Sequence, residues 1–198
     1  MSDISAKKVQ DLRKMTGAGM MDCKKALVEC DGDIEKAVEH LRKTGIAKAA
    51  KKLGRDVSDG RVHAYIHAGA KLGVLLEVFC ETDFVARTED FINFCNDVAM
   101  QIAAEDPLAV TVDQLDPNLV EKEKEIYKGQ ARESGKPEAM LEKIVDGKIE
   151  KFYDQTVLLR QTSIKDSTKT IEQTLQELIG KLGENIQIGN FARFKIGE

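Results

Sequence analysis

The stretch Val74-Leu75-Leu76-Glu77-Val78-Phe79-Cys80-Glu81-Thr82-Asp83-Phe84-Val85-Ala86 joins an apolar run to a polar turn. The run ending at Cys80 is typical of a β-strand, and a helix-like pattern begins near Thr88. Residues 82–86 therefore form a strand-to-helix turn, and turns lie on the surface. We expect Asp83 and Phe84 to be poorly placed for burial in their own core. An exposed ring beside a carboxylate suggests a wedge that enters a pocket of a partner protein.

The same two residues also have ordinary structural interpretations. Asp83 fits a turn or a helix cap, because an Asp side chain often accepts a hydrogen bond from its own backbone there. The ring of Phe84 is equally able to fold back onto the sheet. The residues alone leave these interpretations and the wedge open.

The segments around this turn predict an antiparallel sheet. Val62, Ala64 and Ile66 alternate with polar residues, residues 68–70 turn the chain, and alternation resumes from Leu72 to Val78, which indicates a β-hairpin. The tail, residues 186–196, is strand-like and changes phase near Gly189, which suggests a bulge. We expect it to add a third strand.

Apolar residues at helical spacing predict the remaining elements. Three short helices occupy the first fifty residues, further helices cover 89–104 and 170–182, and a charged helical hairpin covers about 119–159. The predicted fold class is α+β: an N-terminal three-helix module followed by a core in which a three-stranded antiparallel sheet packs with helices and a helical hairpin.

A composition shift separates the two predicted parts. Residues 42–55 contain six basic side chains and no acid. We predict a three-helix module at 1–44, a basic linker at 45–55 and an α+β core at 56–198. The basic run is able to contact RNA phosphate, but a solvated linker is the more common role of such a run.

Two adjacent methionines, Met20 and Met21, open the second predicted helix after the glycine turn at residues 16–19. Neighbouring helical residues lie about 100° apart, so one narrow core stripe does not readily take both. We expect one in the core and the other exposed, where methionine adapts to binding surfaces. The alternative is that both pack at the edge of a small core.

Composition excludes several classes of function. The 198 residues carry a net charge of −4, contain no Trp and only 5% aromatic residues, which argues against nucleic-acid binding by bulk charge or by a stacking platform. The four cysteines never form a CxxC pair, and the sequence shows neither a signal pattern nor a membrane-spanning run. We therefore predict a cytoplasmic protein without cofactor or metal. An enzyme that uses His63 and His67 stays a rival, although no third ligand converges on that pair.

The motifs of this chain resemble the bacterial elongation factor Ts family nearly end to end. The resemblance rests on Val9-x-x-Leu12-Arg13 ahead of Thr16-Gly17-Ala18-Gly19-Met20-Met21-Asp22-Cys23-Lys24. It rests also on Glu81-Thr82-Asp83-Phe84-Val85-Ala86 and on Gly183-Glu184-Asn185-Ile186. The chain is similar to the short members, because it has only one sheet's worth of strands.

The resemblance implies a guanine-nucleotide exchange factor without covalent catalysis that binds elongation factor Tu, both GDP-bound and nucleotide-free. It implies that the three-helix module is like a ubiquitin-associated domain and binds Tu through Leu12, Met20 and Met21. It further implies that Thr82, Asp83, Phe84 and Val85 displace the magnesium of Tu, so that GDP leaves and GTP can bind. Short members tend to dimerise, so we expect a homodimer, with no membrane and no direct nucleic-acid partner.

A rival of another class is an adaptor that uses the three-helix module to bind ubiquitin-like or nascent chains. It depends on the same module and does not need the strand-to-helix turn.

Overall fold

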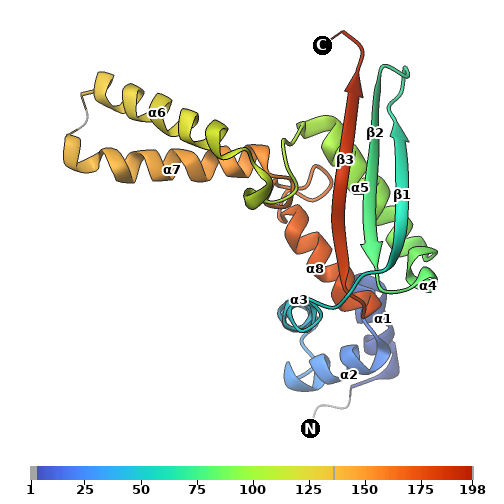
Figure 1. Cartoon of the computed structure of the whole chain (residues 1–198). Helices are drawn as coiled ribbons and strands as arrows, with labels where there is room; N and C mark the ends of the chain where they lie inside the picture. The colour runs from blue at the N-terminus through green and yellow to red at the C-terminus, as the bar shows by residue number, and fades with distance from the viewer. Residues whose placement is uncertain (1–3, 136, 198) are drawn as a thin grey trace. The chain divides into compact units, whose positions relative to one another are not determined.

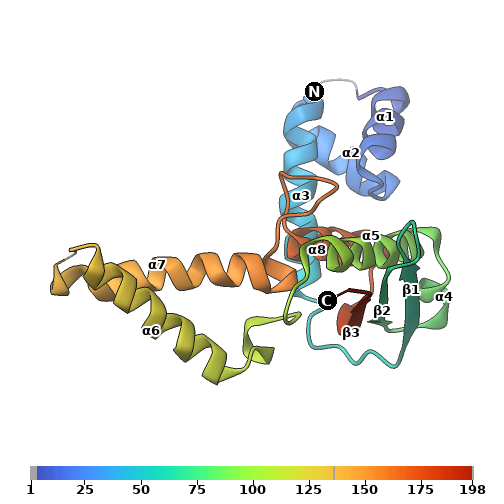
Figure 2. The ribbon, with the colours of Figure 1, turned by 90° about the horizontal axis from the view of Figure 1, so that it is seen from above.

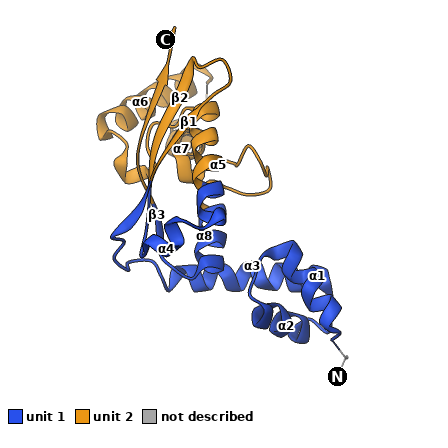
Figure 3. Cartoon of the chain, turned by 90° about the vertical axis from the view of Figure 1, so that its right-hand side faces the viewer, with its two compact units in different colours: residues 1–61, 78–94, 173–187 blue, residues 62–77, 95–172, 188–198 orange. Residues whose placement is uncertain are grey.

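A computed structural model describes residues 4–135 and 137–197. Residues 1–3 of the predicted module, and residues 136 and 198 of the predicted core, lie outside the described residues. The chain divides into two compact units (Figure 3): residues 1–61, 78–94 and 173–187 form unit 1, and residues 62–77, 95–172 and 188–198 form unit 2.

Three strands form one antiparallel sheet in the order β1-β2-β3 (Figure 1): β1 is Asp59–Ile66, β2 is Leu72–Cys80 and β3 is Ile186–Lys195. Alternation along β2 buries Val74, Leu76 and Val78, as period-2 patterning requires. In β3 burial changes phase after Gly189. The predicted α+β class with a three-stranded antiparallel sheet is confirmed.

The N-terminal module consists of α1 (Ala6–Thr16), α2 (Met20–Glu29) and the first half of α3 (Ile34–Ala50). Ser5 caps α1 by accepting from the amide of Lys8, and Asp33 caps α3 by accepting from the amide of Lys36. One small cluster forms its core, made of Val9, Leu12, Cys23, Ala26, Leu27 and Ala37. The three predicted helices are confirmed.

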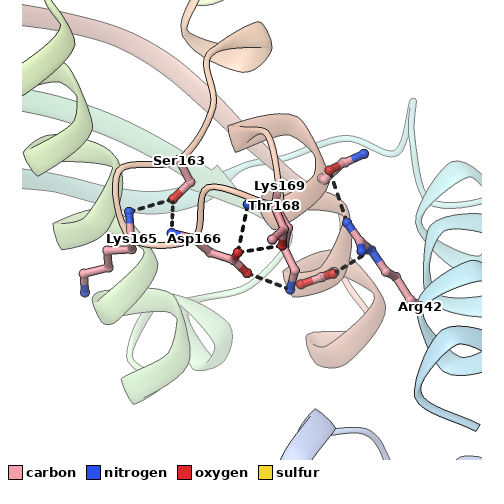
Figure 4. A network of polar contacts seen from close by, with 8 residues as sticks. Arg42, Ser163, Lys165, Asp166, Thr168 and Lys169 are labelled. Atoms are coloured by element: carbon pink, nitrogen blue, oxygen red, sulfur yellow. Dashed lines mark hydrogen bonds and ion pairs between the residues drawn. The ribbon is translucent and has the colours of Figure 1, made fainter. Parts of the chain in front are cut away.

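Helix α3 continues past Gly45 to Ala50, so residues 45–50 of the segment predicted as a linker are helical. A Cβ placed on Gly180 of α8 (Ile171–Leu182) would lie 3.1 Å from the carbonyl oxygen of Gly45. Within unit 1, α3 and α8 thus approach backbone to backbone. Arg42 adds contacts of 3.4 Å to Glu177 and 3.3 Å to Gln173 (Figure 4). The predicted domain boundaries themselves stay a prediction.

In unit 2, α6 (Pro117–Glu133) and α7 (Glu138–Thr156) form the predicted helical hairpin (Figures 1 and 2). Its apolar seam is buried at Ala131, Leu141, Val145 and Ile149. Near its tip Arg132 pairs with Glu138 at 2.7 Å. The short 3-10 helices are η1 (Val112–Gln114) and η2 (Leu158–Arg160).

Helix α5 (Glu89–Glu105) is capped by Thr88, whose hydroxyl accepts a hydrogen bond from the amide of Phe91. Its apolar face, predicted from spacing, is buried at Phe91, Phe94, Cys95, Val98 and Ile102. In unit 2 the buried amide of Gln101 joins this helix to the 161–170 loop, since it donates to Gln161 and accepts from the backbone of Ile164. Figure 4 shows Ser163 and Asp166 directing their oxygens back into that loop.

Gly60 is required where β1 meets β2 in unit 1. Its φ is 153°, and a Cβ there would lie 2.3 Å from the carbonyl oxygen of Val78. Gly45 has no atom within 4 Å of its Cβ position. We expect Gly60→Ala to lower the free energy of unfolding by about 2 kcal/mol or more. Gly45→Ala, inside a helix, should raise it by up to about 1 kcal/mol. Urea unfolding followed by circular dichroism measures both, and equal stability of the two variants would contradict this account.

Candidate partner-binding site

The strand-to-helix turn ends in α4 (Asp83–Ala86), a single helical turn that follows β2 directly. Val85 and Ala86 are buried and fix the turn to the core of unit 1. Successive helical residues are rotated by about 100°, so Phe84 faces away from both of them. Its ring is 81% exposed. The predicted exposure of Phe84 is therefore observed, and the alternative in which the ring folds back onto the sheet is wrong.

Asp83 also projects from the turn. Its carboxylate pairs with Arg87 at 2.9 Å, an i,i+4 contact between two solvent-exposed side chains. Such pairs are weak because water screens them. The carboxylate beside Phe84 is thus held loosely and is available to a partner.

Thr82, the N-cap of α4, does not cap its own helix with its side chain. Its hydroxyl donates to Glu184 at 2.7 Å, and its amide donates to the other oxygen of the same carboxylate at 3.0 Å. In return, the amide of Asn185 donates to Glu81 at 2.6 Å. The sequence motif Gly183-Glu184-Asn185-Ile186 contains these partners, but spacing gave no sign that Glu184 contacts the turn.

Cys80, which precedes the turn, is fully buried and donates its S–H to the carbonyl of Thr82 at 3.1 Å. Burial, reinforced by the negative charge of Glu184, raises the pKa of Cys80 to about 11. The thiol stays protonated at neutral pH and remains a hydrogen-bond donor to the turn.

The two methionines at the start of α2 form a second exposed feature of unit 1. Met20 is 43% exposed and Met21 63% exposed, so neither is in the core. The expectation that one would be buried is wrong, because the core face of α2 begins only at Cys23. The 16–19 loop that precedes them is held by two hydrogen bonds. The hydroxyl of Thr16 donates to the carbonyl of Leu12, and the thiol of Cys23 donates to the carbonyl of Ala18.

Leu12 differs from the methionines, because it lies in the module core with no exposed surface. Because the Leu12 side chain has no exposed surface, it can make no direct contact with a partner in this conformation. In the module core it packs with Val9, Cys23, Ala26, Leu27 and Ala37.

Comparisons with known proteins agree with these motifs. The family model described as "Elongation factor TS" matches residues 2–198. The "Elongation factor Ts" of Solidesulfovibrio magneticus is 56% identical over 198 residues, which cover 100% of this chain and 99% of the relative. Those of Geotalea daltonii and Syntrophobacter fumaroxidans are 55% and 53% identical, over 98% of this chain and over 90% and 98% of the relatives. The chain belongs to the elongation factor Ts family. Its role therefore lies in translation elongation, and the resemblance stated from the motifs is confirmed.

Four of the six basic side chains of segment 42–55 lie near carboxylates of unit 1. Arg42, Lys48 and Arg55 lie within 4 Å of the carboxylates of Glu177, Asp22 and Glu81. Lys43 pairs with Glu39. These pairs are partly or fully solvent-exposed and therefore weak, so they do not decide the RNA interpretation of the segment.

Of the two histidines in the enzyme alternative, His63 lies in β1 and His67 directly follows that strand. His67 shares a hydrogen bond of 2.9 Å with the hydroxyl of Tyr65. Within residues 4–135 and 137–197, no group of three or more His, Cys, Asp or Glu side chains is placed to hold a metal ion. All four cysteines are free thiols. In the same residues, no helix is both long enough and apolar enough to cross a bilayer.

Glu81 makes the stability of the turn depend on pH. The hydrogen bond from the Asn185 amide, helped by Arg55, holds the pKa of Glu81 below its usual value of 4.5. Because the folded pKa is lower than the unfolded one, this contribution is complete above about pH 4.5 and is lost as pH falls through the folded pKa. We expect Glu81→Gln to lower the Tm at pH 7, and the difference from the parent to shrink towards about pH 3. Calorimetry at both pH values measures it; a constant difference would contradict the assignment.

Proposed function

We propose that this chain is the guanine-nucleotide exchange factor of elongation factor Tu and acts in the cytoplasm, where translation takes place. It binds Tu·GDP, displaces Mg²⁺ from Tu and promotes release of GDP so that GTP can bind. It makes no covalent change and is not an enzyme in that sense. The observation that carries the proposal is the ring of Phe84, 81% exposed on a turn whose next two residues are buried.

An exchange factor must bind nucleotide-free Tu more tightly than Tu·GDP, because a ligand shifts an equilibrium only by its differential affinity. The coupling is reciprocal, so GDP weakens the binding of this chain by the same factor. In our proposal Phe84 enters an apolar crevice that opens only when the elements holding magnesium and phosphate have moved. Burying such a ring contributes about 2 kcal/mol, or about thirtyfold in an equilibrium constant.

Asp83 adds a charge at the same place. It gives up the exposed pair with Arg87 and draws a switch segment, or its water ligands, away from the magnesium. The ion is a large local charge beside the phosphates, so its loss removes much of their stabilisation.

Met20 and Met21 are proposed as the anchor on the nucleotide domain of Tu, and Leu12, buried in the same module, helps to hold its helices together. The side chains of the two methionines are exposed and adaptable. Because they would contact Tu with or without nucleotide, they contribute to affinity rather than to coupling.

Phe84→Ala should reduce the maximal GDP release rate from Tu at saturating concentration by about tenfold or more, because the differential burial of the ring is lost. Release of fluorescent GDP from Tu measures it. The matched control is the double variant Met20→Ala with Met21→Ala, which should raise the half-saturating concentration by about tenfold with little change in the maximal rate. Undiminished release by the Phe84→Ala variant would rule out the wedge.

We further propose that the chain forms a homodimer through the open face of its sheet in unit 2. Val62, Ile66, Leu75 and Phe194 are exposed there. The amide of His67 donates to the carbonyl of Leu72, a register that sets Ile66 opposite Gly73. Ile66, Gly73, Leu75, Phe194 and Ile196 line a common apolar hollow. Exposed apolar patches of this kind mark interaction surfaces, and a second copy offers a matching one.

A charged residue in that hollow should separate the dimer. Leu75→Asp combined with Phe194→Asp is expected to sediment as a monomer at concentrations where the parent is a dimer, because association would bury two carboxylates. Ile126→Asp, an exposed apolar site on α6, is the control and should leave the dimer intact. Sedimentation velocity decides: a monomeric parent, or a dimeric double variant, would refute this interface.

A further inference from the structure

Two chain segments about a hundred residues apart exchange hydrogen bonds at the base of the Phe84 turn. The carboxylate of Glu184 accepts from the amide and the hydroxyl of Thr82, 102 residues away. The carboxylate of Glu81 accepts from the amide of Asn185, 104 residues away. In each segment, therefore, one carboxylate accepts a hydrogen bond from a backbone amide of the other segment. We call Glu81, Thr82, Glu184 and Asn185 the crossed clamp.

The crossed clamp fixes the backbone of Thr82 itself. The amide and hydroxyl of Thr82 bind the two oxygens of one carboxylate, while its carbonyl accepts from the amide of Ala86 and the thiol of Cys80. Asn185 is fully buried, and its side-chain amide donates to the carbonyl of Arg55 at 2.7 Å. The segment that holds Glu184 is therefore itself attached to the body of unit 1.

Helix α4 alone does not fix the direction of its first residues. One helical turn of four residues is far too short to be stable alone, and Phe84 has only its backbone to aim it because the ring is exposed. Buried Val85 and Ala86 hold the end of the turn, whereas its beginning, with extended φ and ψ of −136° and 154° at Thr82, is held by Glu184.

We propose that Glu184 is a positioning residue for exchange: by holding Thr82, it aims Phe84 and Asp83 at the nucleotide site of Tu before contact. The proposal rests on the exchange function proposed above. If the clamp is released, the turn samples several directions, and only the fraction with the right direction can open the crevice. The anchor at Met20 and Met21 is untouched by this change. Glu184 therefore acts on coupling and not on initial binding.

The clamp is well suited to a kinetic test, because its hydrogen bonds to Thr82 are solvent-exposed. Exposed contacts contribute little to global stability, so a Glu184 variant should fold. A role confined to folding would lower the amount of active protein. That raises the apparent half-saturating concentration and leaves the maximal rate unchanged. Positioning makes the opposite prediction.

The experiment measures release of fluorescent GDP from Tu across a concentration series of the full chain. Glu184→Ala should lower the maximal rate by about tenfold with the half-saturating concentration unchanged. Glu184→Gln, which keeps one accepting oxygen, should fall between it and the parent. Glu39→Ala removes the carboxylate of an exposed ion pair with Lys43 in the same unit and should match the parent.

A double-mutant cycle identifies the atoms involved. Thr82→Val removes only the hydroxyl donor, and it should lower the maximal rate in the parent but add nothing to Glu184→Ala, because the two groups act as a pair. Additive losses would mean that Glu184 acts elsewhere.

The remaining outcomes separate the two proposals. An undiminished maximal rate for Glu184→Ala, or a change in the half-saturating concentration alone, overturns the positioning role while exchange by the parent stands. A parent that releases no GDP overturns both. A slower maximal rate for Glu184→Ala and for Phe84→Ala, with Glu39→Ala unchanged, supports both.

Discussion

The reciprocal hydrogen bonds between Glu81 and Asn185 and between Glu184 and Thr82 are the constraint on which the exposed turn depends. An aromatic ring buried in a protein core is oriented by the side chains packed around it. A ring left in water has no such packing, so its direction must come from the backbone that carries it. The contacts at Thr82 supply that direction with carboxylates, which bind amides more strongly than neutral acceptors do.

The surroundings of the clamp keep these contacts intact at neutral pH. Cys80 is buried and protonated, since its pKa is raised to about 11, and it donates to the carbonyl of Thr82. Glu81 is ionised, because the Asn185 amide and Arg55 lower its pKa. A donor that must stay neutral and an acceptor that must stay charged are therefore each stabilised in the required form. Both hydrogen bonds are thus kept at neutral pH.

Most of the fold follows from the sequence because periodicity reports burial directly. Val74, Leu76 and Val78, and the stripe from Phe91 to Ile102, are buried where the spacing placed them. Prediction was weaker where a tertiary contact overrides a local signal. Residues 45–55 are predicted as a linker, but α3 continues to Ala50, and the backbone of Gly45 lies close to Gly180. The spacing predicts one of Met20 and Met21 in the core, but the buried face of α2 starts only at Cys23. Leu12, which the resemblance places with the methionines as a contact to Tu, is buried in the module core.

The candidate site, like the fold, could be predicted from the sequence only in part. Although adjacent residues left open whether the ring of Phe84 is exposed, the turn that carries it could be predicted from them. Glu184 could not, because hydrogen bonds between residues 102 apart leave no periodic trace; only the family motif marks the position. This difference bears on mechanism. Because Glu184 lies far from Phe84 in the sequence, a substitution at Glu184 can change the orientation of the Phe84 ring without changing the ring itself. In the proposed exchange mechanism, substitutions in the 183–185 segment would alter how strongly GDP and Tu binding are coupled, while Phe84 and the Met20–Met21 surface keep their chemistry. Under that proposal, coupling and affinity are set by different parts of unit 1.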